Sequence, residues 1–110
     1  MTWTAGLRAE LIPWFSWIVS YINYYDPAGR VSSGYRSTTE QARLYRRFLS
    51  GMMPGPVAPP GLSYHELGRA IDVLASDDAL RRAGAAWEAA GGTWGGHFKT
   101  VAADPIHFEA

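Results

Sequence analysis

One segment, Ser63 to Val73, constrains the fold more than any other. It places His65 and Asp72 seven residues apart, with Gly68 between them, and it runs into the apolar residues of a predicted strand at 70–74. A carboxylate inside an apolar strand is unfavourable to bury unless a cation or hydrogen bonds compensate its charge. The fold therefore has to bring a partner to Asp72.

A second polar segment lies near the end of the chain and contains Asp104, His107 and Glu109. Side chains alternate between the two faces of a strand, so His107 and Glu109 are expected on one face and the apolar neighbours of His107 on the other. The proline after Asp104 favours an extended backbone at that position. Asp104 and His107 are therefore not a helical pair.

The composition is that of one small folded domain. The chain has 110 residues, of which 47% are hydrophobic and 18% charged, which is enough apolar material for a single core. Ten basic residues balance ten acidic ones, so nucleic acid is not expected as a partner. The absence of cysteine excludes disulfides and thiolate metal ligands.

The apolar run at 11–22 is predicted to be a buried amphipathic helix. Its hydrophobic residues recur at helical spacing, with Thr4 as the expected cap and the end near Tyr24. The run is too short to span a bilayer, is interrupted by Pro13, and is followed by no small-residue cleavage site. Neither membrane insertion nor a classical signal peptide is expected.

The rest of the chain indicates an α+β fold, a small antiparallel sheet with helices packed on one side. The glycine- and proline-rich segment 51–62 is predicted to be a loop, and loops of this length are often functional. The other predicted strands lie at 30–36, 70–74 and 106–109, with a strand or turn at 94–98. A second helix is predicted to be capped by Ser37 or Thr38, to carry an apolar stripe and to be ended by Gly51. A third helix, at 79–90, is predicted to be capped within 76–78 and stopped by Gly91.

The nitrogen and oxygen donors of His65, Asp72 and His107 suit zinc, since a catalytic zinc takes three such ligands and keeps one position open. Singly, each is more often a surface or turn residue, but the apolar neighbours of Asp72 and His107 favour ligation. Asp104 is either a nearby general base or part of an Asp-Pro turn. Arg36 is either a clamp for a carboxylate or an oxyanion, or a solvated side chain.

Taken in order, these residues resemble the zinc peptidoglycan peptidases of family M15. The matching pieces are Ser-Gly-Tyr-Arg-Ser at 33–37, Ser-x-His-x-x-Gly-x-Ala-x-Asp at 63–72, Trp-Gly-Gly at 94–96 and Asp-x-x-His-Phe-Glu at 104–109. The family comprises D-alanyl-D-alanine carboxypeptidases, D-Ala-D-Ala dipeptidases and L-alanyl-D-glutamate endopeptidases. Its fold is shared with the hedgehog signalling domain, so the resemblance implies that hedgehog/DD-peptidase-like architecture here.

The resemblance implies one zinc ion per chain, bound by His65, Asp72 and His107. It implies that Asp104 is the catalytic carboxylate and that Arg36 helps to bind substrate and to stabilise the tetrahedral intermediate. The residues with possible supporting roles are Ser63, Gln41, Trp94, His97 and Glu109. Of these, His97 is expected at the pocket rim or the surface, and Trp94 in the core or the pocket wall.

The last two matching pieces most resemble the L-alanyl-D-glutamate endopeptidases of phage endolysins and related autolysins. The resemblance thus implies a zinc-dependent hydrolase that cleaves an amide bond in the peptidoglycan stem peptide. A D-alanyl-D-alanine carboxypeptidase or dipeptidase is the alternative, and a zinc-stabilised binding domain without catalysis is another.

The expected organisation is a single zinc peptidase domain over residues 1–110, monomeric and without a separate wall-binding domain. The resemblance implies a protein made in the cytoplasm that acts on the cell wall during phage or prophage lysis. A virion-associated role during entry is the alternative.

Overall fold

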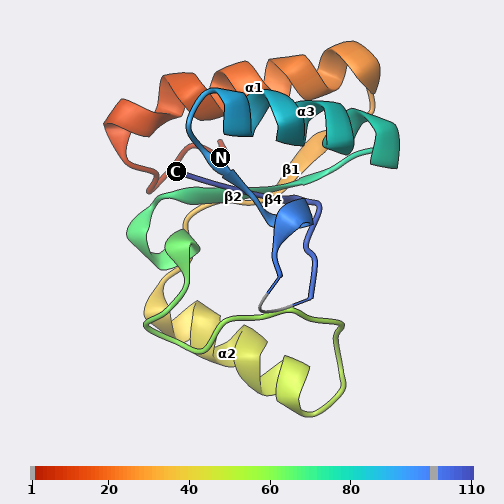
Figure 1. The fold of residues 1–110 in the computed structure, drawn as a ribbon. Coiled ribbons are helices and arrows are strands. Elements are labelled where there is room, and N and C mark those ends of the chain that lie inside the picture. Colours follow the sequence, from red (N-terminus) through yellow and green to blue (C-terminus); the bar gives the residue numbers. More distant parts are fainter. Residues whose placement is uncertain (1, 100–101) are drawn as a thin grey trace.

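The computed structural model describes residues 2–99 and 102–110 (Figure 1). Its helices and strands are α1 (Ile12–Tyr25), β1 (Arg30–Ser33), α2 (Thr38–Leu49), β2 (Ala70–Leu74), α3 (Asp77–Ala89), β3 (Thr93–Trp94) and β4 (His107–Glu109). Short 3-10 helices cover Ala9–Leu11, Tyr64–Leu67 and Gly95–His97. Within these described residues, no helix is long and apolar enough to cross a bilayer.

The four strands form one antiparallel sheet in the order β1-β2-β4-β3. Strands β2 and β4 are central, and Asp72 is paired with His107 in the register between them. Paired residues on neighbouring strands project to the same face of a sheet. The predicted antiparallel sheet is confirmed, and its register brings the side chains of Asp72 and His107 together.

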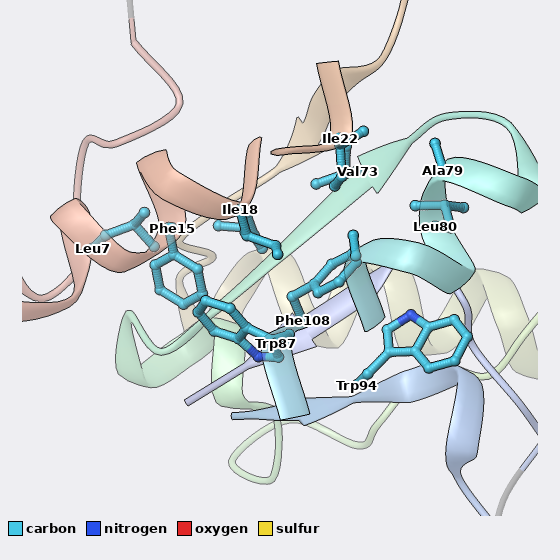
Figure 2. Packing of buried hydrophobic residues seen from close by; sticks show 12 residues of the cluster. Leu7, Phe15, Ile18, Ile22, Val73, Ala79, Leu80, Trp87, Trp94 and Phe108 are labelled. Carbon is cyan, nitrogen blue, oxygen red and sulfur yellow. The ribbon is translucent and has the colours of Figure 1, made fainter. Parts of the chain in front are cut away.

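The hydrophobic core lies on one face of this sheet, beneath α1 and α3 (Figure 1). Phe15, Ile18 and Ile22 of α1 belong to one buried cluster with Val73 and Phe108 of the sheet (Figure 2). All five are fully buried, and each contributes about 1.5–3 kcal/mol through burial. The predicted α+β class, a small antiparallel sheet with helices packed against it, is confirmed, and the helices on the core side are α1 and α3.

Helix α2 lies on the opposite side of the sheet, apart from the core (Figure 1). Its buried residue is the polar Gln41 rather than a hydrophobic one. The apolar stripe expected on this helix is only partly buried, and Leu49 is exposed. Helix α2 therefore forms the far wall of a cavity whose floor is the sheet.

The first helix begins later than the sequence predicted, and Thr4 does not cap it. Thr4 lies in a turn, and α1 begins at Ile12 without a side-chain cap. Pro13 occupies the first turn of the helix, where a proline is favoured because its missing N–H has no intrahelical partner. The proline that interrupts the apolar run therefore marks the start of the helix, which ends at Tyr25.

The predicted strand at 30–36 is also shorter than expected. It ends at Ser33 because the following backbone bonds to His65 instead of to the sheet. The Gly34 carbonyl accepts from the His65 ring, and the Arg36 N–H donates to the His65 carbonyl at 3.1 Å. This departure from the sheet fixes the segment that carries His65.

The two other predicted helices begin at the expected caps. The Ser37 hydroxyl accepts the Glu40 N–H at 3.1 Å, and the Ser76 hydroxyl accepts the Ala79 N–H at 3.3 Å. The segment predicted as a strand or turn at 94–98 is divided between β3 and a 3-10 helix.

Candidate metal centre

His65, Asp72 and His107 converge on the face of the sheet opposite the core. One possible ligand atom from each residue lies within 4.8 Å of the other two. Asp72 Oδ1 is 3.2 Å from both His65 Nε2 and His107 Nδ1. All three side chains are buried. The fold thus brings together the three residues that the sequence analysis proposed as metal ligands.

The segment Tyr64–Leu67 carries His65 on a single 3-10 turn with a capping box at its start. The Ser63 hydroxyl accepts the His65 N–H at 3.2 Å, and the Glu66 carboxylate accepts the Ser63 N–H at 3.2 Å. Gly68 follows with a φ of 68°, and a Cβ there would lie 2.7 Å from the Gly6 carbonyl oxygen. Only glycine fits this left-handed, crowded position.

Hydrogen bonds on the outer side of each ring set the histidine tautomers. His65 Nδ1 donates to the Gly34 carbonyl at 2.7 Å, since a carbonyl can only accept. His107 Nε2 donates to the Glu109 carboxylate at 2.7 Å. In the neutral form of each ring, His65 Nε2 and His107 Nδ1 therefore present their lone pairs towards the Asp72 carboxylate. This is the arrangement by which outer partners orient metal-binding imidazoles.

Asp72 divides its two oxygens between a cation and the two histidines. Arg36 Nη2 donates to Oδ2 at 2.8 Å, which leaves Oδ1 facing His65 and His107. The other guanidinium nitrogens of Arg36 donate to Ser33 Oγ at 2.9 Å and to Gln41 Oε1 at 3.1 Å. In this structure Arg36 positions Asp72 and also lines the cavity.

Gln41, 1% exposed, links this network to the loop at 51–62. Its Oε1 accepts from Arg36, and its Nε2 donates to the Ala58 carbonyl at 2.8 Å. Because Gln41 is on α2, one buried amide ties the helix, the arginine and the loop together. Gln41 therefore supports the metal ligands indirectly, by holding the arginine that is paired with Asp72.

The charges of the donor set require compensation. Burial alone raises the pKa of Asp72, but hydrogen bonds and charges from His107 and His65 outweigh burial and hold that pKa well below its usual range. Burial lowers the pKa of His107, but the carboxylates of Asp72 and Glu109 reverse this and raise it to about 9. In the metal-free protein a proton on His107 thus compensates Asp72. A dication fits the same position, because two nitrogens and one carboxylate oxygen are already aimed at one point.

Asp104 lines the same cavity without joining the three convergent donors. Its N–H donates to the Gly95 carbonyl at 2.8 Å, and its carbonyl accepts the His107 N–H at 3.0 Å. Burial, followed by the charge of Asp72, raises the pKa of the Asp104 carboxyl. A partly buried carboxyl with a raised pKa is suited to exchanging protons with a reacting group. A side chain at Gly95 would collide with the Asp104 carbonyl, which explains that glycine.

Two of the proposed supporting residues lie outside the cavity lining. Trp94 is buried in the core, and its Nε1 donates to the Pro105 carbonyl at 2.8 Å. His97 is exposed, and its ring pairs with Glu88 at 2.7 Å. By contrast, Ser63 and Glu109 both line the cavity.

Glu66 is a site residue that the sequence analysis did not single out. Its carboxylate accepts the N–H groups of Gly61 and Ser63 and the Thr38 hydroxyl, so it holds the His65 segment against the start of α2. Ser63 and Glu66 are spaced as a capping box, and that pattern could have identified Glu66 from the sequence.

The cavity has a volume of about 590 Å³ and an asymmetric lining. Its apolar wall comes largely from residues 53–62. Its polar wall carries the charged residues and histidines of the site, which are Arg36, His65, Asp72, Asp104, His107 and Glu109. A second hollow of about 480 Å³ shares Arg36, Leu44, Met53 and Asp72 with the first. These shared side chains therefore stand between the two hollows.

A comparison with known families decides the membership of the chain. The VanY family, described as D-alanyl-D-alanine carboxypeptidase, matches residues 5–94. The chain belongs to this family. The resemblance to zinc peptidoglycan peptidases that the motifs indicated is thereby confirmed. No curated protein sequence matches the chain significantly.

Solved structures with the same fold include several carboxypeptidases and related peptidases. The D,D-pentapeptidase VanY of a VanB-type resistance cassette, in complex with Zn(II), has a TM-score of 0.71 at 19% identity over 94% of this chain and 71% of that one. The L,D-carboxypeptidase DacB of Streptococcus pneumoniae has a TM-score of 0.69 at 19% identity over 96% and 66%.

Another solved structure with this fold is the L-Ala D-Glu endopeptidase ChiX of Serratia marcescens. It has a TM-score of 0.57 at 24% identity, over 96% of this chain and 81% of ChiX. The chain spans about half, 49%, of the D,D-dipeptidase VanXYg. At these identities the structural likenesses establish the fold.

Proposed function

We propose that this protein is a zinc-dependent peptidase that hydrolyses an amide bond in the peptidoglycan stem peptide. The observation that carries the proposal is the convergence of His65 Nε2, Asp72 Oδ1 and His107 Nδ1 in a chain of the VanY family. Related structures support the metal and the ligand class: a VanY structure contains Zn(II), and others contain D-Ala-D-Ala or its phosphinate analogue.

A zinc ion held by His65, Asp72 and His107 supplies Lewis-acid chemistry for amide hydrolysis. Asp104 takes the proton from the attacking water and passes it to the leaving amine, a task that its raised pKa favours. Arg36 uses three of its five N–H groups on Ser33, Gln41 and Asp72. Its remaining N–H groups are available to the oxyanion of the tetrahedral intermediate.

We infer that the bond cleaved is the one between L-Ala and D-Glu. An endopeptidase needs room on both sides of the scissile bond, and we assign this room to the two hollows that share Arg36 and Asp72 in their linings. The end of the chain at 104–109 supports the same choice through its resemblance to endolysin-type endopeptidases. A D-alanyl-D-alanine carboxypeptidase is the second candidate, because the matching family carries that description.

A defined stem pentapeptide distinguishes these activities by the products it releases. The zinc-reconstituted protein is incubated with N-acetyl-L-Ala-γ-D-Glu-L-Lys-D-Ala-D-Ala, and the products are identified by mass spectrometry. Release of N-acetyl-L-alanine supports the endopeptidase, free D-Ala supports the carboxypeptidase, and the D-Ala-D-Ala dipeptide supports a dipeptidase. If the peptide stays intact while zinc is bound, the chain is a zinc-stabilised binding domain.

We further propose that residues 1–110 act as one monomeric catalytic domain on the cell wall during phage or prophage lysis. The support is the resemblance to endolysins. Adding purified protein to isolated cell walls and following turbidity and newly released amino groups tests this. No release of amino groups would contradict the wall-degrading role, and a dimer in analytical ultracentrifugation would contradict the monomer.

A further inference from the structure

The charged groups in the cavity are unevenly divided by sign. Among the lining residues that the structure describes, Arg36 is the one Lys or Arg side chain, and it is accompanied by the carboxylates of Asp72, Asp104 and Glu109. With both histidines neutral and all three carboxylates ionised, these side chains carry a net charge of −2. A bound dication brings the total to zero. The site therefore has no surplus positive charge for an anionic substrate group.

Arg36, the one Lys or Arg side chain of this described lining, is already paired with Asp72, and the N–H groups that it has left serve the oxyanion in the proposed reaction. Arg36 Nη2 lies 2.8 Å from Asp72 Oδ2, and its other two nitrogens donate to Ser33 and Gln41. Its side chain is 17% exposed, so the ion pair is largely shielded from solvent. Moving Arg36 to a substrate carboxylate would leave Asp72 unpaired, which is strongly unfavourable for a buried charge.

The remaining carboxylates act on any anion that enters. Asp104 and Glu109 lie on the polar wall without a Lys or Arg partner in the described part of the chain, and Glu109 is bonded to the His107 ring. Asp72, Asp104 and Glu109 together repel an added carboxylate in this cavity, where Arg36 is the single opposing Lys or Arg side chain of the described lining. A substrate carboxylate would meet the same repulsion, whereas a carboxamide would meet two hydrogen-bond acceptors.

We propose that this site selects stem peptides whose D-glutamate α-carboxyl is carried as the carboxamide. The inference rests on the proposed L-Ala–D-Glu endopeptidase function. The α-carboxyl group is attached to the same carbon as the scissile nitrogen, so it has to enter the cavity with the reacting bond. As an amide it is neutral, and its NH₂ group can donate to the carboxylates of the polar wall. As a free acid it is an uncompensated anion in a partly buried site.

The test compares two substrates that differ only in this group. N-acetyl-L-Ala-γ-D-Glu-L-Lys and the matching tripeptide with the α-carboxamide are incubated separately with the zinc-reconstituted protein, and kcat/KM is measured for each. We expect kcat/KM for the amide to be higher by about tenfold or more at low ionic strength. Equal values, or a preference for the acid, would overturn the inference while leaving the endopeptidase function intact.

A pair of charge variants gives the matched control. Leu62 lines the cavity and is 73% exposed, and Leu49 is 65% exposed at the end of α2, away from the lining. Leu62→Lys adds a positive charge at the cavity and should reduce the preference for the amide by about threefold or more, whereas Leu49→Lys should leave it unchanged. An equal effect of both variants, or none, would contradict the electrostatic origin.

Binding to the metal-free protein provides a readout independent of catalysis. Without the metal, the carboxylates of Asp72, Asp104 and Glu109 still outnumber the single guanidinium of the described lining, so the expected order of affinities is the same. Isothermal titration calorimetry should show tighter binding of the amide tripeptide than of the acid. If neither peptide is cleaved by the zinc-loaded protein, the proposed function fails and this measurement decides the inference. Equal affinities, tighter binding of the acid, or no binding of either would overturn it.

Discussion

At the scale of single residues, the site depends on how Asp72 distributes its two oxygens. Oδ2 is held by Arg36, and Oδ1 faces the lone pairs of His65 and His107. The outer partners of both rings, Gly34 and Glu109, leave those lone pairs free for a metal. Asp104 stands beside this set and carries the proton-transfer role in the proposed reaction.

Asp104→Asn should separate metal binding from catalysis. An amide cannot take up or deliver the proton, so we expect kcat to fall by about 10²–10⁴-fold. Zinc content should stay at one ion per chain, because Asp104 is not among the convergent donors. Elemental analysis and a peptide-cleavage assay on the same sample measure both quantities. A fully active variant would remove Asp104 from the mechanism.

Glu109→Ala should weaken zinc binding through the His107 ring. Without the hydrogen bond to Nε2, the imidazole loses its fixed tautomer, and we expect zinc affinity to fall by about 10–100-fold. Glu88→Ala is the control, because Glu88 makes a contact of the same length, 2.7 Å, with the exposed His97. Competition with a chromophoric chelator measures both affinities. Equal affinities for the two variants would contradict the role of Glu109.

At the scale of helices and strands, the correct predictions are those that depend on residues close together in the sequence. The caps at Ser37 and Ser76 and the central strand at 70–74 were recognisable from short-range patterns. The start of the first helix was wrong, because Pro13 outweighed the capping potential of Thr4. The 3-10 turn around His65 was not predicted, although Ser63 and Glu66 are spaced as a capping box at its start. The bond that orients the His65 ring, to the Gly34 carbonyl, depends on tertiary structure.

In the candidate site, too, features set by nearby residues were predictable and features set by tertiary contacts were not. The ligand types and their order were readable from the sequence, as was the shared face of His107 and Glu109. The ion pair between Arg36 and Asp72 could not be predicted from the sequence, because 36 residues separate the two and the sheet brings them together. The link from Gln41 to the loop at Ala58 likewise depends on tertiary structure.

Gly68→Ala should destabilise the element that carries His65. The residue has a φ of 68°, and a Cβ would lie 2.7 Å from the Gly6 carbonyl oxygen. We expect a loss of about 1–3 kcal/mol in the free energy of unfolding, from both strain and the clash. Gly91→Ala is the matched control: its φ is 101°, but its Cβ would meet no atom within 4 Å. Denaturant unfolding should show the smaller loss for Gly91→Ala, and equal losses would contradict the packing argument.

At the scale of the whole molecule, folding and metal binding are coupled, because the ligands come from a 3-10 turn and two strands. Core and site occupy opposite faces of one sheet, so the helices stabilise the strands that hold Asp72 and His107. Zinc binds the folded arrangement and not the unfolded chain, so it should stabilise the protein.

This coupling should depend on pH in a defined direction. The folded-state pKa of His107, about 9, is above its unfolded value of about 6.5. The stability that the protonated ring contributes to the metal-free protein is therefore fully present below about pH 6.5 and is lost as the pH rises through about 9. Zinc has to displace this proton, so its affinity should rise across the same interval.

Thermal unfolding with and without zinc, between pH 6.5 and 9, measures the effect. The difference in Tm at a fixed zinc concentration should grow with pH. A difference that stays constant or shrinks would contradict the assignment of the displaced proton to His107.

The most direct test of the central claim is a mass-spectrometric time course of one stem pentapeptide with the zinc-reconstituted protein. We expect a single internal or terminal amide cleavage that stops when a chelator removes the metal and resumes when zinc is restored. A pentapeptide that remains intact beside protein carrying one zinc ion per chain would contradict it.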